Sequence, residues 1–281
     1  MPHSDHRLIT WQRITLVTLL TGYAGYYVCR SNLSVVTPLI LNEFADVGIT
    51  KRDIGSIASL GVFLYAIGKI NNGILVDMLG GRPLFILGMF ASVLCTVLFG
   101  LSSGMTAFLV IWACNRFFQS MGWVSVVKTA SRWFPFHRHA TVMGILSMSF
   151  LAGDAAVRFY LGALMDWGLG WRGVFFVSAA TLGAIAVVTL FTLKSSPQDI
   201  GADEPEANPI NVYGDKEHTP PHKSVRRLLA PLLSSTSGLE RMRAIRALPG
   251  PLARIGNWQN DIHVRDDAGV RAGPDRVQEA V

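Results

Sequence analysis

Two cationic side chains stand in apolar segments where a lipid-spanning helix should carry no charge. Arg30 lies in the segment of residues 14–38, and Lys69 lies in the segment of residues 54–78. A charge at the centre of a bilayer costs about 2.5 to 3.5 kcal/mol on insertion scales, so it usually faces a bundle interior or an aqueous cavity. We therefore expect Arg30 and Lys69 to serve a binding site.

The two cations suit an anionic ligand. At about 1.5 Å per residue, both side chains reach the middle of the bilayer from antiparallel helices, where they would repel each other unless an anion lay between them. A phosphate monoester fits this place because Arg can bind its oxygens bidentately while Lys supplies a point charge. Two other interpretations remain open: each cation pairs with a separate carboxylate, or Arg30 extends toward the interface near Pro38.

Aromatic and acidic residues stand close to these cations. Tyr23 and Tyr27 precede Arg30 by seven and three residues, so helical periodicity places all three side chains on one stripe. Asp154 is the deep acidic candidate for a partner, and it precedes Arg158 by four residues, a spacing that allows an ion pair within one helix. That pair either neutralises itself with only a packing role or also contacts the ligand.

The composition indicates which elements must position these side chains. Half of the 281 residues are hydrophobic and only 16% are charged, which is typical of a polytopic helical membrane protein and not of a soluble enzyme. The net charge of +6 does not indicate nucleic-acid binding, because the basic residues flank apolar segments. The three cysteines lack metal-ligand spacing and should be buried. We expect no metal site and no cofactor.

The sequence predicts an all-α membrane protein built on a bundle of six transmembrane helices. The predicted spans are residues 14–38, 54–78, 84–103, 106–128, 140–164 and 172–193. The predicted domains are a cytoplasmic N-terminus (1–13), the six-helix transmembrane domain (14–193), a polar cytoplasmic linker (194–224) and an Arg-rich tail (225–281) that we expect to be disordered or frameshifted. Basic residues concentrate on one side of the spans, so we expect both termini in the cytoplasm and the protein in a bacterial inner membrane.

A charged turn between the second and third predicted spans follows a known pattern. The pattern G-x-L-x-D-x-x-G-R-R is matched at Gly73, Leu75, Asp77, Gly80 and Arg82, with Gly81 in place of the first basic residue. This run resembles the loop motif of the major facilitator superfamily. We expect a structural and gating hinge, in which Asp77 pairs with Arg82 or with a neighbouring loop.

Other runs resemble the organophosphate:phosphate antiporter family within that superfamily. They are Tyr26-Tyr27-Val28-Cys29-Arg30-Ser31-Asn32, Gly68-Lys69, the stretch from Asn115 to Trp123, Lys128 and Trp133-Phe134. The family includes glycerol-3-phosphate, hexose-phosphate and glucose-6-phosphate transporters and a related hexose-phosphate sensor. The resemblance implies that Arg30 and Lys69 bind phosphate among Tyr23, Tyr27 and Tyr65. The other candidate substrate-binding residues are Trp123, Arg116 and Arg158.

The fourth and fifth spans depart from the family pattern. Phosphate porters usually carry N-G-x-x-Q-G-x-G-W-P-P, whereas this chain has Arg116, Ser120, Val124 and Ser125 there. The fourth helix therefore gains a cation and lacks the prolines. Ser149 stands where glycerol-phosphate and hexose-phosphate porters carry a histidine, so the resemblance does not identify the phosphate ester.

The resemblance covers roughly residues 11–205, which corresponds to the N-terminal one of the two six-span halves of a family transporter. The family's second phosphate-binding arginine comes from the seventh span, and no residue here stands in its place. Three interpretations of residues 225–281 are open: a frameshifted remnant of a longer gene, which we favour, the natural tail of a half-transporter, or a basic segment held on anionic lipid.

These observations predict a transporter, truncated to one half, that exchanges an organophosphate or sugar phosphate for inorganic phosphate without any covalent chemistry. The alternatives are a membrane sensor of sugar phosphate and an inactive transporter fragment. The expected partners are the phosphate ligand, the lipid bilayer, and either a second copy or a complementing half-transporter.

Overall fold

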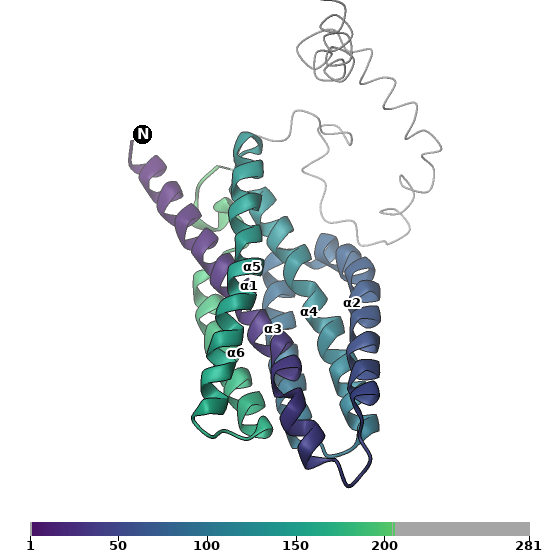
Figure 1. Ribbon diagram of the computed structural model, residues 1–281. Helices are drawn as coiled ribbons and strands as arrows, with labels where there is room; N and C mark the ends of the chain where they lie inside the picture. Colours follow the sequence, from purple (N-terminus) through teal and green to yellow (C-terminus); the bar gives the residue numbers. More distant parts are fainter. Residues whose placement is uncertain (1, 204, 206–281) are drawn as a thin grey trace, which may run out of the picture. The chain divides into compact units, whose positions relative to one another are not determined.

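The computed structural model describes residues 2–203 and 205, which are almost entirely helical (Figure 1). The α-helices of this part are α1 (Pro2–Glu43), α2 (Lys51–Leu79), α3 (Gly81–Leu101), α4 (Met105–Trp133), α5 (His139–Asp166) and α6 (Trp171–Thr192). Two short 3₁₀ helices, η1 (Phe136–Arg138) and η2 (Pro197–Ile200), precede α5 and follow α6. The prediction of an all-helical protein is confirmed for these residues, whereas the predicted tail, residues 225–281, lies outside them.

Successive helices run in opposite directions, because the connections between them are short (Figure 1). Side chains tie the connections together at one end of the bundle. Gln12 Nε2 donates to the Trp133 carbonyl oxygen at 2.9 Å, and Trp133 Nε1 donates to the Lys194 carbonyl oxygen at 3.2 Å. The first part of α1 thus meets the end of α4 and the residue after α6, as an up-and-down bundle requires.

The other end is held by a carboxylate at the end of α1. Glu43 accepts a hydrogen bond from Trp171 Nε1 at 2.6 Å and forms an ion pair with Arg172, both at the start of α6. Arg172 Nη2 also donates to Ser103 Oγ, between α3 and α4, at 3.3 Å. The hydrogen bond from Arg172 holds the pKa of Glu43 below its usual value.

The helix packing brings α1 beside α4. Helix α4 packs on α2 and α3, α1 packs on α5 and α6, and contacts between α3 and α6 join the two groups. Aromatic rings fill the space between α3, α4 and α6, where Phe99 stacks on Phe108 at 4.7 Å and on Phe175 at 4.5 Å between ring centroids. Direct contacts between α1 and α4 then set the distance between the polar residues that these two helices carry.

Small residues allow α2 to approach α4 closely. A Cβ atom on Gly68 would overlap the Ser120 hydroxyl, and Asn72 Nδ2 donates to that hydroxyl at 2.7 Å. Packing through small residues and polar contacts between helices is typical of membrane bundles. The contact fixes the position of Lys69, which follows Gly68 in the chain.

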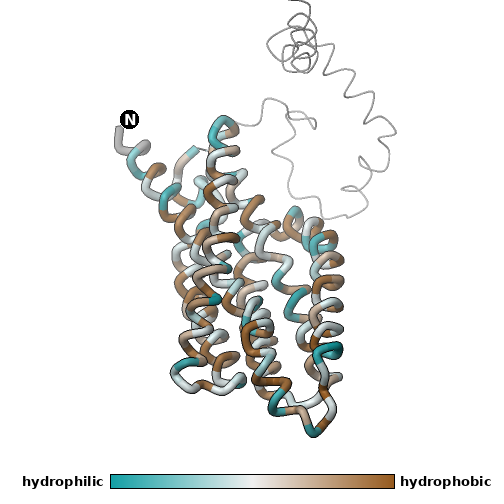
Figure 2. The backbone as a smooth tube through the Cα atoms, viewed as in Figure 1, coloured by the Kyte–Doolittle hydropathy of each residue, from teal (hydrophilic) through white to brown (hydrophobic). Residues whose placement is uncertain are grey.

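Apolar side chains cover much of the outside of the helices (Figure 2). Phe63, Phe159 and Phe191 are examples of large hydrophobic side chains that are exposed. Within the described residues, four helical segments are long and apolar enough to cross a membrane: Lys51–Leu79, Gly81–Leu101, Phe136–Asp166 and Trp171–Thr192. Such an exterior favours a lipid environment, because apolar area exposed to water is unfavourable.

The predicted count of six spans is not confirmed: four of the predicted spans fall in these segments, whereas α1 and α4 do not reach the hydropathy of a span. Both helices are long enough, at 42 and 29 residues, but they carry Arg30 and Asn32 in α1 and Asn115, Arg116 and Gln119 in α4. Polar residues inside a membrane bundle are usually functional, and they lower the hydropathy of the helices that carry them.

Helix α1 is longer than the predicted span of residues 14–38. It begins at Pro2, so the segment predicted as a separate N-terminus continues the helix, and Pro38 lies inside it without ending it. The prediction followed the apolar stretch, whereas helical hydrogen bonding continues through the polar flanks. Proline is tolerated in helices of this kind because neighbouring groups satisfy the freed carbonyl.

Two smaller predictions differ from the structure. The predicted polar linker, residues 194–224, begins with the ordered helix η2, because Asp199 Oδ2 accepts a hydrogen bond from Ser195 N at 2.8 Å and Ile200 packs against the core. Cys29 and Cys95 are buried, as predicted, but the prediction of a buried Cys114 is wrong. Cys114 lies on the outward face of α4, one turn after the exposed Val110.

Candidate functional site

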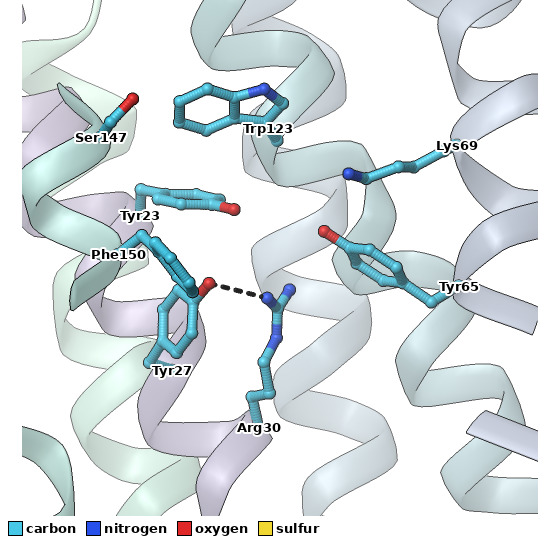
Figure 3. A pocket seen from close by; sticks show the side chains of 8 residues that line it. All are labelled: Tyr23, Tyr27, Arg30, Tyr65, Lys69, Trp123, Ser147 and Phe150. Carbon is cyan, nitrogen blue, oxygen red and sulfur yellow. Dashed lines mark hydrogen bonds between the residues drawn. The ribbon is translucent and has the colours of Figure 1, made fainter. Parts of the chain in front are cut away.

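A cavity of about 350 Å³ lies between α1, α2, α4 and α5 (Figure 3). It is lined by Tyr23, Tyr27, Arg30, Tyr65, Lys69, Trp123, Ser147 and Phe150. Six of these side chains were predicted from the sequence, and Ser147 and Phe150 were not. The Arg30 guanidinium and the Lys69 ammonium point toward the same space as the Tyr65 hydroxyl (Figure 3).

Arg30 is held in place on two sides, by Gln119 and Tyr27. Its Nε donates to Gln119 Oε1 at 3.1 Å, and its Nη1 donates to the Tyr27 hydroxyl at 3.0 Å. Its Nη2 is buried and has no hydrogen-bond partner among the described residues. A buried donor without a partner is unfavourable, so this geometry is suited to a ligand that accepts a hydrogen bond there.

Gln119 orients Arg30 because its own amide is fixed by the core. Its Nε2 donates to the Cys29 carbonyl oxygen at 3.1 Å, to Asn115 Oδ1 at 3.0 Å and to Ser92 Oγ at 3.2 Å. The Gln119 side chain is fully buried. Sequence reasoning missed this positioning role, although the resemblance to the pattern of phosphate porters covered the residue.

Three cations surround the ring of Tyr65. The Cζ atoms of Arg30 and Arg116 each lie 4.9 Å from the ring centroid, and Lys69 Nζ lies 5.1 Å from it. Arg30 Cζ also lies 4.5 Å from the centroid of the Tyr27 ring. Contacts between cations and aromatic faces are attractive, and they partly offset the cost of gathering like charges here.

Aromatic side chains form the opposite wall of the cavity. Tyr23 lies 5.7 Å from Tyr27 and 5.2 Å from Trp123, and Tyr27 lies 5.8 Å from Phe150, all between ring centroids. Ser147 and Phe150, the two lining residues that were not predicted, both lie on α5. The wall offers apolar surface and hydroxyl groups to a ligand.

Asp154 does not neutralise Arg30 directly. Its Oδ1 accepts a hydrogen bond from Ser31 Oγ at 2.5 Å, and its Oδ2 lies 2.9 Å from Arg158 Nε. Arg158 Nη1 reaches toward Ser34 Oγ at 3.5 Å. Neither Asp154 nor Arg158 lines the cavity, and Arg116 does not line it either, so the predicted substrate contacts of Arg158 and Arg116 are not part of the observed wall.

The predicted hinge connects four helices. Asp77 pairs with Lys128 of α4 at 2.8 Å rather than with Arg82, whose Nη2 donates to the Leu190 carbonyl oxygen of α6 at 3.0 Å. Gly80 has φ +87°, a conformation that favours glycine, and it separates α2 from α3. Gly73 has open space where a side chain would be, so the structure gives it no packing role.

Comparison with known proteins identifies the family. Residues 19–249 match the profile of the Major Facilitator Superfamily, and this match runs past residue 225 into the predicted tail. A probable hexose phosphate transport protein of Chlamydia pneumoniae is 27% identical over 213 residues, which are 76% of this chain and 45% of the relative. A membrane sensor protein UhpC of Salmonella typhimurium is 28% identical over 197 residues, 70% of this chain and 44% of the relative.

Solved structures support the fold. A crystal structure of a bacterial homologue of the human lysosomal transporter Spinster, inward-facing and unoccupied, matches with a TM-score of 0.58 at 19% identity. The match covers 71% of this chain and 46% of that one. The chain thus spans about half the length of the relatives that it matches. It belongs to the Major Facilitator Superfamily, whose members are integral membrane transport proteins and not enzymes.

Proposed function

We propose that this chain binds a phosphate ester between Arg30 and Lys69 and takes part in its exchange for inorganic phosphate across the membrane. The observation that supports this best is the Arg30 guanidinium, which is held by neutral partners and whose buried Nη2 has no hydrogen-bond partner within the described residues. A phosphate dianion would accept hydrogen bonds from Nη2 and from the Lys69 ammonium, as cation–phosphate pairs commonly do.

The remaining walls suit the ester portion of such a ligand. Tyr23, Tyr27 and Tyr65 offer hydroxyl groups, and Trp123 and Phe150 offer apolar surface. A volume of about 350 Å³ is within the usual range for a site that holds a small molecule. The cavity has no carboxylate among its lining residues, so an anion meets no repulsion from its walls.

Exchange of a phosphate ester for inorganic phosphate requires that both anions bind to the same residues. Inorganic phosphate and a phosphate ester present the same oxygens to Arg30 and Lys69, so they compete for one site. We propose that the described helices act as one half of a transporter. A second six-helix body, either another copy or a complementing half, would then complete the site and rock against the first. We further propose, from the charge bias, that the ends that hold Gln12 and Lys194 face the cytoplasm of a bacterial cell.

Binding and flux measured on one preparation test the proposal. The purified full chain is titrated with inorganic phosphate by calorimetry, and the same preparation is placed in phosphate-loaded liposomes to follow uptake of glycerol 3-phosphate. We expect saturable binding of phosphate and competition by the ester. Absence of saturable binding at millimolar phosphate would show that Arg30 and Lys69 do not form a phosphate site.

A membrane sensor is the second candidate function. The similarity to the sensor UhpC, 28% over 197 residues, is comparable to the similarity to the hexose phosphate transport protein, 27% over 213 residues. A sensor needs the same binding site but no alternating access. Binding without uptake, in liposomes that contain the complementing half of a related transporter, favours the sensor.

A further inference from the structure

Arg116 of α4 is a third cation beside the cavity: it does not line the wall, but its Cζ lies 4.9 Å from the centroid of the Tyr65 ring, which does. Its Nη1 donates to Gln119 Oε1 at 3.0 Å, and the same oxygen accepts the Nε proton of Arg30. Two guanidinium groups therefore share one neutral acceptor. Like charges held this close together are unfavourable unless an anion binds near both of them.

The fold makes room for this side chain. A Cβ atom on Gly61 would lie 2.8 Å from Arg116 Cγ, so α2 passes Arg116 only because it has no side chain there. Gly61, Tyr65 and Lys69 lie on successive turns of α2 and therefore on one face. Arg116 of α4 thus approaches the Tyr65 ring beside Gly61, one turn of α2 before Tyr65. Lys69 approaches the same ring from one turn of α2 after Tyr65.

The charges of this region do not balance. Arg30, Lys69 and Arg116 form no ion pair with any carboxylate in the part of the chain that the structure describes. Asp154, the acidic residue nearest to them on α5, has both oxygens engaged by Ser31 and Arg158. A phosphate monoester supplies about two negative charges at neutral pH, so three cations leave one positive charge without a counterpart.

We infer that the ligand of this site is a phosphate ester that also carries a carboxylate, a phosphorylated carboxylic acid of a few carbons. Its phosphate lies between Arg30 and Lys69, and its carboxylate lies at Arg116. Arg116 then determines specificity, because it distinguishes such a ligand from an ester whose remainder is neutral. A carboxylate matches the single spare charge and the planar donor fork of Arg116. This inference rests on the proposed phosphate site.

Two three-carbon probes of nearly equal size test the inference. 3-Phosphoglycerate and glycerol 3-phosphate differ in having a carboxylate or a hydroxymethyl group, and both phosphates are dianionic at about pH 8. Calorimetry on the full chain at fixed ionic strength should show that 3-phosphoglycerate binds about tenfold more tightly or better, as a charge-assisted hydrogen bond predicts. In the Arg116→Gln variant, the ratio of the two affinities should fall to about one.

Two controls separate recognition from a general effect of charge or folding. Arg116→Lys keeps the cation and should retain part of the preference. Arg52→Gln removes a cation from the exposed start of α2 and should leave the ratio at the value of the unmodified chain. The inference is overturned if the unmodified chain shows no preference, or if Arg116→Gln weakens both probes equally. Failure of both probes and of inorganic phosphate to bind would instead reject the phosphate site itself.

Discussion

The side-chain oxygen of Gln119 accepts the Nε proton of Arg30 at 3.1 Å, so a neutral amide orients the guanidinium without removing its charge. The orientation is fixed from behind, because the Gln119 amide nitrogen donates to Asn115, Ser92 and the Cys29 carbonyl oxygen. A carboxylate in the same place would hold Arg30 equally well but would compete with an anionic ligand. The choice of an amide therefore matches the proposed phosphate site.

Replacement of Arg30 by lysine should weaken phosphate binding about tenfold to hundredfold. The ammonium cannot donate to Gln119, Tyr27 and a phosphate oxygen in the fixed plane of the guanidinium, and each charge-assisted hydrogen bond contributes about 1.5 to 3 kcal/mol. Calorimetric titration with inorganic phosphate checks this result. Arg52→Lys, at the exposed start of α2, is the matched control. Equal affinity in Arg30→Lys would contradict the proposed role.

Gln119→Glu should abolish most phosphate binding while the protein stays folded. The new carboxylate would lie beside both Arg30 and Arg116 and pair with them, which lowers the affinity for an added anion by at least about tenfold. Gln119→Met, which has neither charge nor acceptor, tests the alternative that any change at this position disturbs the network. If the methionine variant binds phosphate as poorly as the glutamate variant, neutralisation is not the cause.

Asp77→Asn should change stability slightly and leave phosphate affinity within about twofold. The Asp77–Lys128 pair is partly exposed, with 45% and 38% of the side-chain surfaces accessible, so it contributes about 1 kcal/mol or less. Asp77 does not line the cavity, but it joins α2 to α4, and exchange in liposomes should slow more than binding weakens. The double exchange Asp77→Lys with Lys128→Asp should restore the rate, and a tenfold loss of affinity in Asp77→Asn would argue against a hinge role.

Glu43 should make the stability of the folded chain depend on pH in the acidic range. Because Arg172 lowers the pKa of Glu43, its contribution is fully present above the ordinary glutamate value of about 4.3 and is lost as the pH falls through the lowered folded value. Both side chains are partly exposed, so screening keeps the contribution below about 1 kcal/mol.

Thermal unfolding of the unmodified chain and of Glu43→Gln, measured from about pH 7 to pH 3, checks this prediction. The difference between the two should be present at neutral pH and should shrink in acid. Asp46→Asn, which removes an exposed carboxylate nearby, should not show this change. A difference between the unmodified chain and Glu43→Gln that stays constant over the whole range would show that Glu43 and Arg172 are not coupled in this way.

Cysteine labelling should establish the topology. In a variant without the native cysteines, single cysteines at Arg7 and Gln198 should react with a membrane-impermeant maleimide only from the cytoplasm, and a cysteine at Ser103 only from outside. All three positions are exposed in the structure. Ser196 is unsuitable because it is buried beside η2. Reaction of the residue-198 cysteine from outside would exclude an even number of spans.

The residues of the cavity show what could be predicted from the sequence. Arg30 and Lys69 were identified because a charge is conspicuous in an apolar segment, and Tyr27 because helical spacing ties it to Arg30. Phe150 and Ser147 carry no such signal, since apolar and small side chains are ordinary in a membrane helix. Their place in the wall depends on how α5 packs against α1, which only the structure shows.

The sequence also predicts a charged pair within one helix better than a charged pair between two helices. The spacing of Asp154 and Arg158 within one helix almost fixes their separation, and the structure places them 2.9 Å apart. The partner of Asp77 lies 51 residues away on another helix, so proximity along the chain wrongly suggested Arg82. The bounds of α1 were misjudged because hydropathy reports the thickness of a membrane and not the extent of helical hydrogen bonding.

Arg30 and Ser31 are consecutive residues of α1, yet they serve different neighbours. Arg30 faces the cavity, and Ser31 donates to Asp154 of α5. At this level of α1 the two side chains point in directions about 100° apart, because the helix has 3.6 residues per turn. They therefore contact different neighbours. A rotation of α1 that improves the fit of Arg30 to a ligand necessarily moves the Ser31 hydroxyl relative to Asp154. Ligand binding in the cavity and the position of α5 are therefore coupled through two consecutive residues of α1.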